Sequence, residues 1–455
     1  VSTRGRAPEL GFSDTLLAGL ATDGGLYVPA VWPTLPDLPP AADYEAVAAA
    51  VIAPFVGGEI PGGALAAMID DAYATFRHPA VAPLVQIDDH HYLLELFHGP
   101  TLAFKDVALQ LVGRMFDHVL AERGEHITIV GATSGDTGSA AIDGVRGCEH
   151  VDIVILYPEG RTSDVQRRQM TTVDAPNVHT VAVAGTFDDC QDLVKAMFAD
   201  EPFRDELRLS AVNSINWARV MAQIVYYVTA SRTFAEAPSF CVPTGNFGNV
   251  LAGWVAREMG APIDDFVVAS NRNDILTRFI RDDDMSMRPV EASLSPSMDI
   301  QVSSNFERLL FEMNGRDGGV TAEQLARFRA TGRLDIEADQ RREFVTGTFR
   351  AARCDDDETL AEIARVHAET GLLVDPHTAT ATSAIRSLGA ERPTITLATA
   401  HPAKFPDAVE RATGIRPPLP PALADLHDRP EHIVRAAADL GEIQGFVRSV
   451  ARIAS

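Results

Sequence analysis

Lysine is scarce in this 455-residue chain, which carries only Lys105, Lys195 and Lys404 among 39 basic residues. Arginine supplies the rest of the positive charge, and an arginine side chain does not lose its proton in a protein. It cannot act as a base or a nucleophile, whereas a buried lysine can do both. Side-chain amine chemistry is therefore confined to these three residues.

Basic residues are also outnumbered by 63 acidic ones, which leaves a net charge of −24. Such a chain is not expected to bind nucleic acid or an anionic membrane. No apolar run approaches the roughly 18 residues that a membrane helix needs. The first residues, VSTRGRAPEL, lack the apolar core of a signal peptide. We therefore expect neither a membrane nor a nucleic acid as a partner.

Cysteine is sparse as well, and the four cysteines are scattered without a CxxC pair: Cys148, Cys190, Cys241 and Cys354. This spacing argues against a disulfide framework and against a zinc site, so no metal is expected. It is typical of reduced thiols and indicates a cytoplasmic protein.

Short apolar strands alternate with helices from about residue 91 onward, as in HITIVG, VDIVILYP and SFCVPTG. This alternation predicts an α/β protein whose parallel sheets are covered by helices on both faces. We expect an N-terminal domain over 1–90, a smaller α/β domain over 91–225 and a larger one over 226–455. Residues 281–350 break the rhythm and predict a helical insertion, and the tail beyond Pro417 is expected to be helical.

The three lysines lie in different settings. Lys195 lies in an amphipathic pattern, DDCQDLVKAMF, and is expected on the surface. Lys404 lies in TAHPAKF, which predicts a loop. Lys105 lies in HGPTLAFKDVALQ, where a buried helix should begin. Its stem could pack on the core while its ammonium reaches water, or it could be catalytic, and this stretch alone favours neither reading.

Two segments follow one plan of apolar strand, loop rich in glycine and hydroxyl groups, and helix: ITIVGATSGDTGSAA and SFCVPTGNFGNVLAGWVA. Glycines let backbone N–H groups face a ligand, and a helix N-terminus attracts anions. Neither loop has the Walker A or the GxGxxG pattern, and such turns also occur simply as connections. A buried lysine together with a phosphate-binding loop is, however, what a pyridoxal phosphate enzyme requires.

Long, ordered motifs from Ser2 to about Pro406 resemble the long form of threonine synthase found in many bacteria and fungi. They are STRG, GLATDGGLYVP, ELFHGPTLAFKDVALQ, GATSGDTGSAA, NSINWARVMAQIVYY, PTGNFGNVLAG, SPSMDIQVSSNFERLLFE and TAHPAKF. The resemblance implies a fold-type II pyridoxal 5'-phosphate enzyme, similar in fold to the tryptophan synthase β-chain. It also implies the conversion of O-phospho-L-homoserine and water to L-threonine and phosphate.

The resemblance implies a role for each motif residue. Lys105, flanked by Phe104 and Asp106, holds the cofactor as a Schiff base, and Thr399 lies beside the pyridine nitrogen. The loop that binds the cofactor phosphate is Gly245, Asn246, Phe247, Gly248 and Asn249. Asp136 lies near the cofactor's 3′-oxygen. An ionised Asp136 would repel that oxygen and the substrate carboxylate, so we expect a raised pKa or a rotated side chain.

The implied substrate site has two parts. Across fold-type II enzymes, the loop after the lysine helix holds the substrate carboxylate, and here its residues are Thr133, Ser134, Gly135 and Thr137. Asn213, Ser214 and Arg219 in NSINWAR are expected to bind the substrate phosphate, because arginine suits bidentate phosphate binding. Arg4 in STRG is a further basic residue that the sequence does not place.

Two alternatives remain open. Another fold-type II enzyme, such as a serine/threonine dehydratase or a β-replacing synthase, would share the lysine and the glycine loop but would need no second phosphate site. A catalytically silent relative that binds a phosphate ligand would not need Lys105. NSINWAR and SPSMDIQVSSNFERLLFE favour threonine synthase. Monomer and homodimer are both compatible with the sequence.

Overall fold

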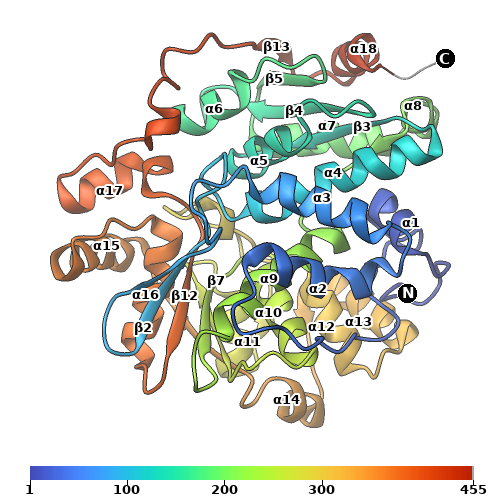
Figure 1. Ribbon diagram of the computed structural model, residues 1–455. Coiled ribbons are helices and arrows are strands. Elements are labelled where there is room, and N and C mark those ends of the chain that lie inside the picture. Colours follow the sequence, from blue (N-terminus) through green and yellow to red (C-terminus); the bar gives the residue numbers. More distant parts are fainter. Residues whose placement is uncertain (453–455) are drawn as a thin grey trace.

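Two sheets organise the chain, and Figure 1 shows them one above the other. In this computed structural model, which describes residues 1–452, the lower sheet has six strands in the order β1-β2-β12-β7-β8-β11. The strands are β1 (Leu84–Gln86), β2 (His91–Glu95), β7 (Ser239–Pro243), β8 (Phe266–Ser270), β11 (Phe349–Arg353) and β12 (Thr394–Ala398). Apart from the antiparallel β1–β2 pair, the strands run parallel.

The upper sheet is parallel throughout and has five strands in the order β13-β5-β4-β3-β6. They are β3 (Ile127–Ala132), β4 (Val151–Pro158), β5 (Val178–Ala184), β6 (Leu209–Ser210) and β13 (Val434–Ala437). Every residue of β4, β7, β8 and β12 is buried. Burial on both faces explains why these strands are continuous apolar runs in the sequence.

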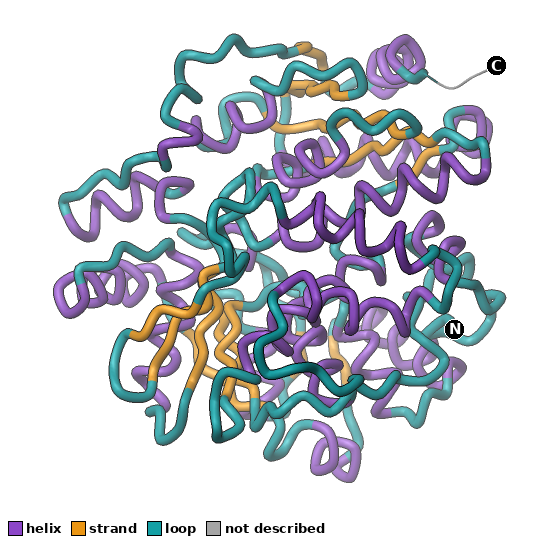
Figure 2. Tube along the Cα trace, in the orientation of Figure 1, coloured by secondary structure: helices purple, strands orange, loops and turns teal. Residues whose placement is uncertain are grey.

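Helices cover both sheets (Figure 2). Those that follow the strands of the upper sheet or connect it to the lower one are α4 (Lys105–Arg123), α5 (Asp136–Val145), α6 (Asp164–Thr171), α7 (Phe187–Ala199), α8 (Glu201–Glu206), α9 (Trp217–Ser231) and α18 (Leu440–Val450). Apart from three helices of the insertion, which are given below, the others beyond β2 are α10 (Gly248–Glu258), α11 (Ile275–Asp282), α15 (Asp356–Thr370), α16 (Pro376–Leu388) and α17 (Pro406–Thr413), with short 3-10 helices η1 (Pro296–Met298), η2 (Pro402–Lys404) and η3 (Pro421–Leu423). The arrangement confirms the predicted α/β fold with parallel sheets.

The N-terminal segment contributes α1 (Phe12–Ala18), α2 (Tyr44–Val56) and α3 (Gly62–Tyr73). Helix α2 packs on α9 and α3 packs on α4, so this segment covers the helices that carry site residues. The expected insertion contains α12 (Phe306–Met313), α13 (Gly318–Thr331) and α14 (Ala338–Phe344). It also contains a small antiparallel pair that the sequence did not predict, β9 (Met285–Ser286) and β10 (Arg333–Leu334).

The domain boundaries expected at 90/91 and 225/226 do not separate the strands of the lower sheet from those of the upper sheet. Strand β2 follows the first limit but joins the lower sheet, and β13, near the C-terminus, joins the upper one. The expectation of a wholly helical tail was therefore wrong at β13. Val434 to Ala437 is too short to show a strand pattern, and its pairing with β5 fixes it as an edge strand. No described helix has both the length and the hydrophobicity that crossing a membrane requires.

Helices α4 and α5 approach closely at two glycines. A Cβ atom on Gly113 of α4 would lie 1.9 Å from the main-chain oxygen of Gly144. A Cβ atom on Gly144 of α5 would lie 2.5 Å from the main-chain oxygen of Leu109. Because α4 begins at Lys105 and α5 at Asp136, this backbone contact sets the distance between two expected site residues.

We predict that Gly144→Ala lowers the free energy of unfolding by roughly 1–3 kcal/mol, because the added methyl group pushes α4 and α5 apart. The control is Gly445→Ala on α18, where no atom lies within 4 Å of the added carbon. That change should stabilise the protein by roughly 0.5–1 kcal/mol, since alanine is the better helix former. Denaturant unfolding of both variants measures the difference, and equal stabilities would contradict the prediction.

Candidate active site

Lys105 is the first residue of α4, and its side chain is only 8% exposed. The loop before it docks on the end of β12, where the N–H of Phe104 donates to the main-chain oxygen of Thr399 at 2.9 Å. Leu102 adopts a left-handed conformation, with φ 64°, to make this turn. The amine is thus buried and does not reach water along its stem. Lys195 lies on the surface as expected.

Asp136 is the centre of the charged contacts around Lys105. Its Oδ2 lies 3.3 Å from the Lys105 amine, and its Oδ1 lies 2.9 Å from the amine of Lys404. The amide of Gln166 also donates to Oδ1, at 2.8 Å. Burial alone would raise the pKa of Asp136, but Lys404 and Lys105 outweigh it and hold that pKa far below the usual range. Of the two expected alternatives, a raised pKa or a rotated side chain, the raised pKa is contradicted, because the two lysines lower it.

Lys404 is a site residue that the sequence did not identify. It lies in η2, and its side chain is completely buried. Its amine also donates to the main-chain oxygen of Thr101 at 2.7 Å. The scarcity of lysine was the one signal that pointed to it. The pKa of Lys105 is lowered by burial; Asp136 opposes this shift, while Lys404 and Arg219 add to it.

Three more buried residues near these lysines were not predicted as site residues. Asp375 caps α16, and its carboxylate lies 2.8 Å from Nδ1 of His377. His377 is close enough to Asp136 to help lower the pKa of that carboxyl. Asp106, behind Lys105, accepts from the N–H and hydroxyl of Thr101, and burial raises its pKa to about 6. Asp106 therefore supports the lysine loop through Thr101, and Lys404 lowers its pKa in part.

The loop from Gly245 to Asn249 leads into the N-terminus of α10. Phe247 adopts the left-handed conformation, with φ 61°, and no side chain caps the helix. None of the backbone N–H groups from Gly245 to Asn249 donates to an acceptor in the described part of the chain. Uncapped N–H groups at a helix N-terminus are suited to an anion.

Residues 303–305 hold this glycine loop in place. The hydroxyl of Ser303 donates to the main-chain oxygen of Gly245 at 2.8 Å. The side-chain amide of Asn305 donates to the main-chain oxygens of Asn246 and Ser214, each at 3.1 Å. A Cβ atom on Gly248 would lie 3.1 Å from that amide, so only glycine fits without displacing it.

Asn249 presents a free donor. Its carbonyl oxygen accepts from the hydroxyls of Tyr226 at 2.6 Å and Tyr227 at 2.9 Å, which fixes the orientation of the amide. Its Nδ2 is buried and has no partner in the structure. Because an unpaired buried donor is costly, this atom points to a ligand.

The loop before α5 is shaped by its own hydrogen bonds. The hydroxyl of Thr133 accepts from the N–H groups of Gly135 at 3.0 Å and Gly138 at 2.9 Å. Gly135 has φ 148°, and a Cβ atom there would lie 2.5 Å from Gln166. Ser134 is exposed and Thr137 is half-buried. Thr133 therefore supports the loop, and Ser134 is its accessible hydroxyl.

Arg219, in the first turn of α9, is a buried cation that has no counter-ion among residues 1–452. It is 3% exposed, and within the same residues its Nε and Nη1 atoms have no hydrogen-bond partner. Burial lowers its pKa to about 10. Asn213 and Ser214 precede the helix and are half-buried. A buried, unpaired guanidinium is expensive, so this arrangement indicates an anion-binding site.

Arg308 joins the N-terminal segment to the residues that precede α9 and α12. Its fully buried guanidinium donates to the main-chain oxygens of Tyr27 at 3.0 Å and Ile215 at 2.6 Å, and it also contacts Asn305. Arg4, which the sequence left unplaced, pairs with Glu307 at 2.9 Å. Arg4 therefore anchors the N-terminus to α12 and is not free for a ligand.

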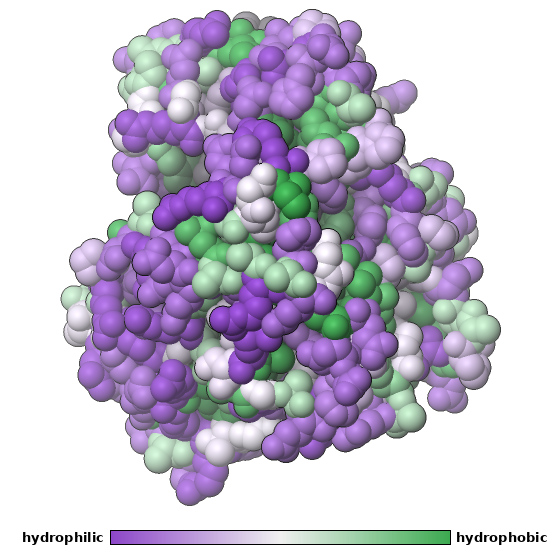
Figure 3. Space-filling view, turned by 90° about the vertical axis from the view of Figure 1, so that its left-hand side faces the viewer, coloured by the Kyte–Doolittle hydropathy of each residue, from purple (hydrophilic) through white to green (hydrophobic). Residues whose placement is uncertain are grey.

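A cavity of about 790 Å³ opens beside Lys404. Ser134, Gln166 and Lys404 line it, and so do residues nearer the C-terminus: Arg416, Pro417, Pro418, Leu419, Ala424 and His427. It lies on the side of the molecule that carries α15 and α17. Figure 3 shows that side, with hydrophobic residues gathered between the upper and lower parts. Gln166 and Lys404, which both contact Asp136, therefore line an open cavity.

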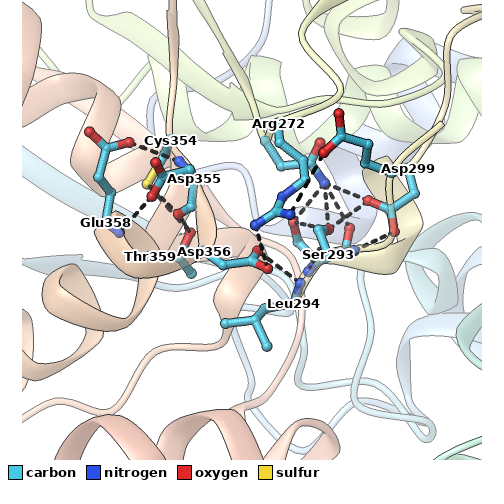
Figure 4. A network of polar contacts seen from close by, with 12 residues as sticks. Arg272, Ser293, Leu294, Asp299, Cys354, Asp355, Asp356, Glu358 and Thr359 are labelled. Carbon is cyan, nitrogen blue, oxygen red and sulfur yellow. Dashed lines mark hydrogen bonds and ion pairs between the residues drawn. The ribbon is translucent and has the colours of Figure 1, made fainter. Parts of the chain in front are cut away.

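One wall of the cavity, Ser293 to Pro296, is held by the polar network in Figure 4. The carboxylate of Asp299 accepts from the hydroxyl and N–H of Ser293, at 2.6 and 3.0 Å. Asp356 accepts from the N–H of Leu294 at 3.1 Å and pairs with Arg272 at 2.9 Å. This wall is thereby fixed to the lower sheet.

The residues present fit pyridoxal phosphate. A buried lysine with a lowered pKa suits an aldehyde. The free N–H groups at α10 suit a phosphate, and the unpaired Nδ2 of Asn249 adds a donor near them. The structure places Lys105 beside Asp136 and the lysine loop on Thr399, and the glycine loop begins at the end of β7, the neighbour of β12 in the lower sheet. The roles of these residues stay predictions.

Comparisons with known proteins agree with this geometry. Three family descriptions match the chain: "Threonine synthase N terminus" over residues 1–73, "Pyridoxal-phosphate dependent enzyme" over 75–337 and "Threonine synthase, C-terminal" over 378–447. The threonine synthase of Pseudomonas aeruginosa is 51% identical, over 98% of this chain and 97% of that protein.

Two solved structures are also similar along their whole length. The crystal structure of PLP-bound threonine synthase from Brucella melitensis is 51% identical, covers 99% of both chains and has a TM-score of 0.97. The yeast threonine synthase structure is 38% identical, covers 99% of this chain and 98% of its own, and has a TM-score of 0.93. The chain belongs to the threonine synthase family of pyridoxal-phosphate dependent enzymes.

Proposed function

We propose that this protein is a threonine synthase that converts O-phospho-L-homoserine and water to L-threonine and phosphate. The observation that carries the proposal is that two sets of free anion donors surround the part of the fold that holds one buried lysine. The N-terminus of α10 follows β7, the neighbour of the β12 strand on which the lysine loop docks. The guanidinium of Arg219 is close enough to Lys105 to lower the pKa of its amine. A cofactor phosphate and a substrate phosphate account for both.

When bound, pyridoxal phosphate supplies an aldehyde that bonds to Lys105 and a ring that withdraws electrons from the α-carbon of the substrate. Lys105 is the group that removes and returns the proton at that carbon, because burial and the nearby cations favour its neutral form. The buried setting also keeps bulk water from competing for this proton.

The cofactor phosphate is assigned to the N–H groups of Gly245 to Asn249, with the amide of Asn249 as a further donor. Thr399 contributes a hydroxyl beside the pyridine nitrogen, and Phe104, whose ring centre lies 5.0 Å from the Lys105 amine, flanks the ring. A neutral hydroxyl partner would leave that nitrogen unprotonated. Asp136 is assigned to the 3′-oxygen side.

The substrate is assigned to two positions. The loop of Thr133, Ser134, Gly135 and Thr137 holds its carboxylate, with Ser134 as the hydroxyl that faces the cavity. Asn213, Ser214 and Arg219 hold its phosphate. The support is the unpaired guanidinium, which gains a counter-ion only when an anion binds.

The enzyme is further proposed to act in the cytoplasm. Its four cysteines all lie in the described part of the chain and are free thiols, which suits a reducing compartment. Monomer and homodimer both remain compatible with the proposal.

The function is tested by adding O-phospho-L-homoserine to the purified protein and measuring release of phosphate together with formation of threonine. A dehydratase would instead release ammonia from serine, without phosphate chemistry. A silent binding protein would release neither product. Phosphate and threonine in equal amounts support the proposal, and either other result rejects it.

Lys105→Ala is predicted to abolish turnover and covalent attachment of the cofactor while leaving thermal unfolding nearly unchanged. The reason is that no other amine occupies this position. Borohydride reduction followed by peptide mapping identifies the attachment site, with Lys195→Ala as an exposed control. Attachment of the cofactor at Lys195 or Lys404 in the parent protein would show that the assignment is wrong.

Gly248→Val is predicted to weaken cofactor affinity at least about tenfold, because the new side chain displaces Asn305 and obstructs the free N–H groups. Gly62→Val is the matched control, since Gly62 is likewise the first residue of a helix and has no atom within 4 Å of an added carbon. Titration with pyridoxal phosphate gives both affinities. If the Gly248 variant binds like the parent, the cofactor phosphate lies elsewhere.

Arg219→Ala is predicted to raise the KM for O-phospho-L-homoserine about 10- to 100-fold, since a buried charged hydrogen bond is worth roughly 1.5–3 kcal/mol. Cofactor attachment at Lys105 should persist, and homoserine analogues without phosphate should bind parent and variant alike. Loss of the cofactor, or an unchanged KM, would make Arg219 a structural residue.

A further inference from the structure

Two of the three lysines in this chain converge on one carboxylate. The amines of Lys105 and Lys404 lie 3.3 and 2.9 Å from opposite oxygens of Asp136. A single carboxylate needs only one cation to balance its charge. The second lysine therefore requires an explanation beyond neutralisation.

The two lysines are built into the fold differently. Lys404 is completely buried, and its amine also donates to the main-chain oxygen of Thr101 at 2.7 Å. Its backbone is fixed in η2, where the N–H of Lys404 donates to His401 at 3.0 Å. Lys105, by contrast, has Asp136 as its only hydrogen-bond partner in the described residues. Lys404 is a fixed partner of the carboxylate, and Lys105 can be withdrawn.

Withdrawal of Lys105 is what its assigned reaction demands. Its ammonium must first give a proton to solvent, and the neutral amine then adds to the aldehyde and expels water as C=N replaces C=O. If Lys105 were the only cation beside Asp136, this step would leave a buried carboxylate without a counter-ion, which is strongly unfavourable.

We propose that Lys404 is a positioning residue, a permanent buried counter-ion that holds the Asp136 carboxylate so that Lys105 is free to react with the cofactor. This inference rests on the proposed function, because it takes Lys105 as the lysine that binds the cofactor. It assigns to the lysine of TAHPAKF a role that acts through Asp136.

The charged and titratable groups facing this cluster come from several elements: Lys105 and Asp106 on α4, Asp136 on α5, Arg219 on α9, His377 on α16 and Lys404 on η2. Gln166 on α6 is a neutral partner of the carboxylate. Removing Lys404 takes away a positive charge and leaves Lys105 as the one lysine paired with Asp136. Both effects keep Lys105 protonated.

The test measures how fast the full-length protein, stripped of cofactor, captures added pyridoxal phosphate between about pH 6 and pH 10. Samples are quenched with borohydride, and the modified Lys105 peptide is quantified. The variants are Lys404→Met, Asp136→Asn and the double variant. Lys195→Met is the matched control, because Lys195 also lies 2.9 Å from an aspartate, Asp192, but on the surface.

Lys404→Met should displace the pH dependence of capture upward by about one unit, which slows capture near neutral pH about tenfold. In the Asp136→Asn background the same change should have much less effect, because the carboxylate that traps Lys105 is gone. Lys195→Met should behave like the parent. An unchanged pH dependence in Lys404→Met, or an equal displacement in both backgrounds, overturns the proposal.

Thermal unfolding establishes that each variant is folded. Lys404→Met leaves Thr101 with its hydrogen bond from Gln169 at 3.0 Å. If that variant does not fold, the Asp136→Asn variant alone tests the proposal. In that variant Lys105 still has the ammonium of Lys404 nearby but no longer has the carboxylate of Asp136. Its pH dependence should move downward by about one unit, and no movement overturns the proposal. Capture at another lysine in the parent would instead reject the proposed function.

Discussion

The carboxylate of Asp136 accepts from three side chains that reach it from three separate elements: Lys105 on α4, Gln166 on α6 and Lys404 on η2. A buried charge is tolerated only when it is paired. The three elements must therefore all be in place for any one of them to be stable around Asp136. The close approach of α4 and α5 at Gly113 and Gly144 places the first pair. The docking of β12 on the lysine loop places Lys404.

The local features of the site were predictable from the sequence. Lys105 begins a helix because Gly99 and Pro100 form a turn before an apolar helical pattern, and the glycine loop before α10 follows directly from strand, glycines and helix. The alternation of strands and helices likewise predicted the parallel sheets. These features depend on short stretches of chain, where turn chemistry and hydrophobic period carry the information.

What the sequence did not predict depends on contacts between distant segments. TAHPAKF predicts a loop, and nothing in it shows that Lys404 is buried against Asp136. One expectation was a raised pKa for Asp136, because bound anions would repel its carboxylate. The sequence does not show that Lys105 and Lys404 both lie next to that carboxylate, where they lower its pKa. Similarly, Arg308 carries no motif of its own, yet it joins Tyr27, Ile215 and Asn305.

Strand β13 closes the edge of the upper sheet, although the other strands of that sheet are complete by Ser210. A ribosome synthesises the chain from its N-terminus. The upper sheet is therefore incomplete until Val434 to Ala437 have been made, and Asp136 lacks its contact with Lys404 until that residue has been made. Lys105 is therefore made early but meets its full set of partners only near the end of translation.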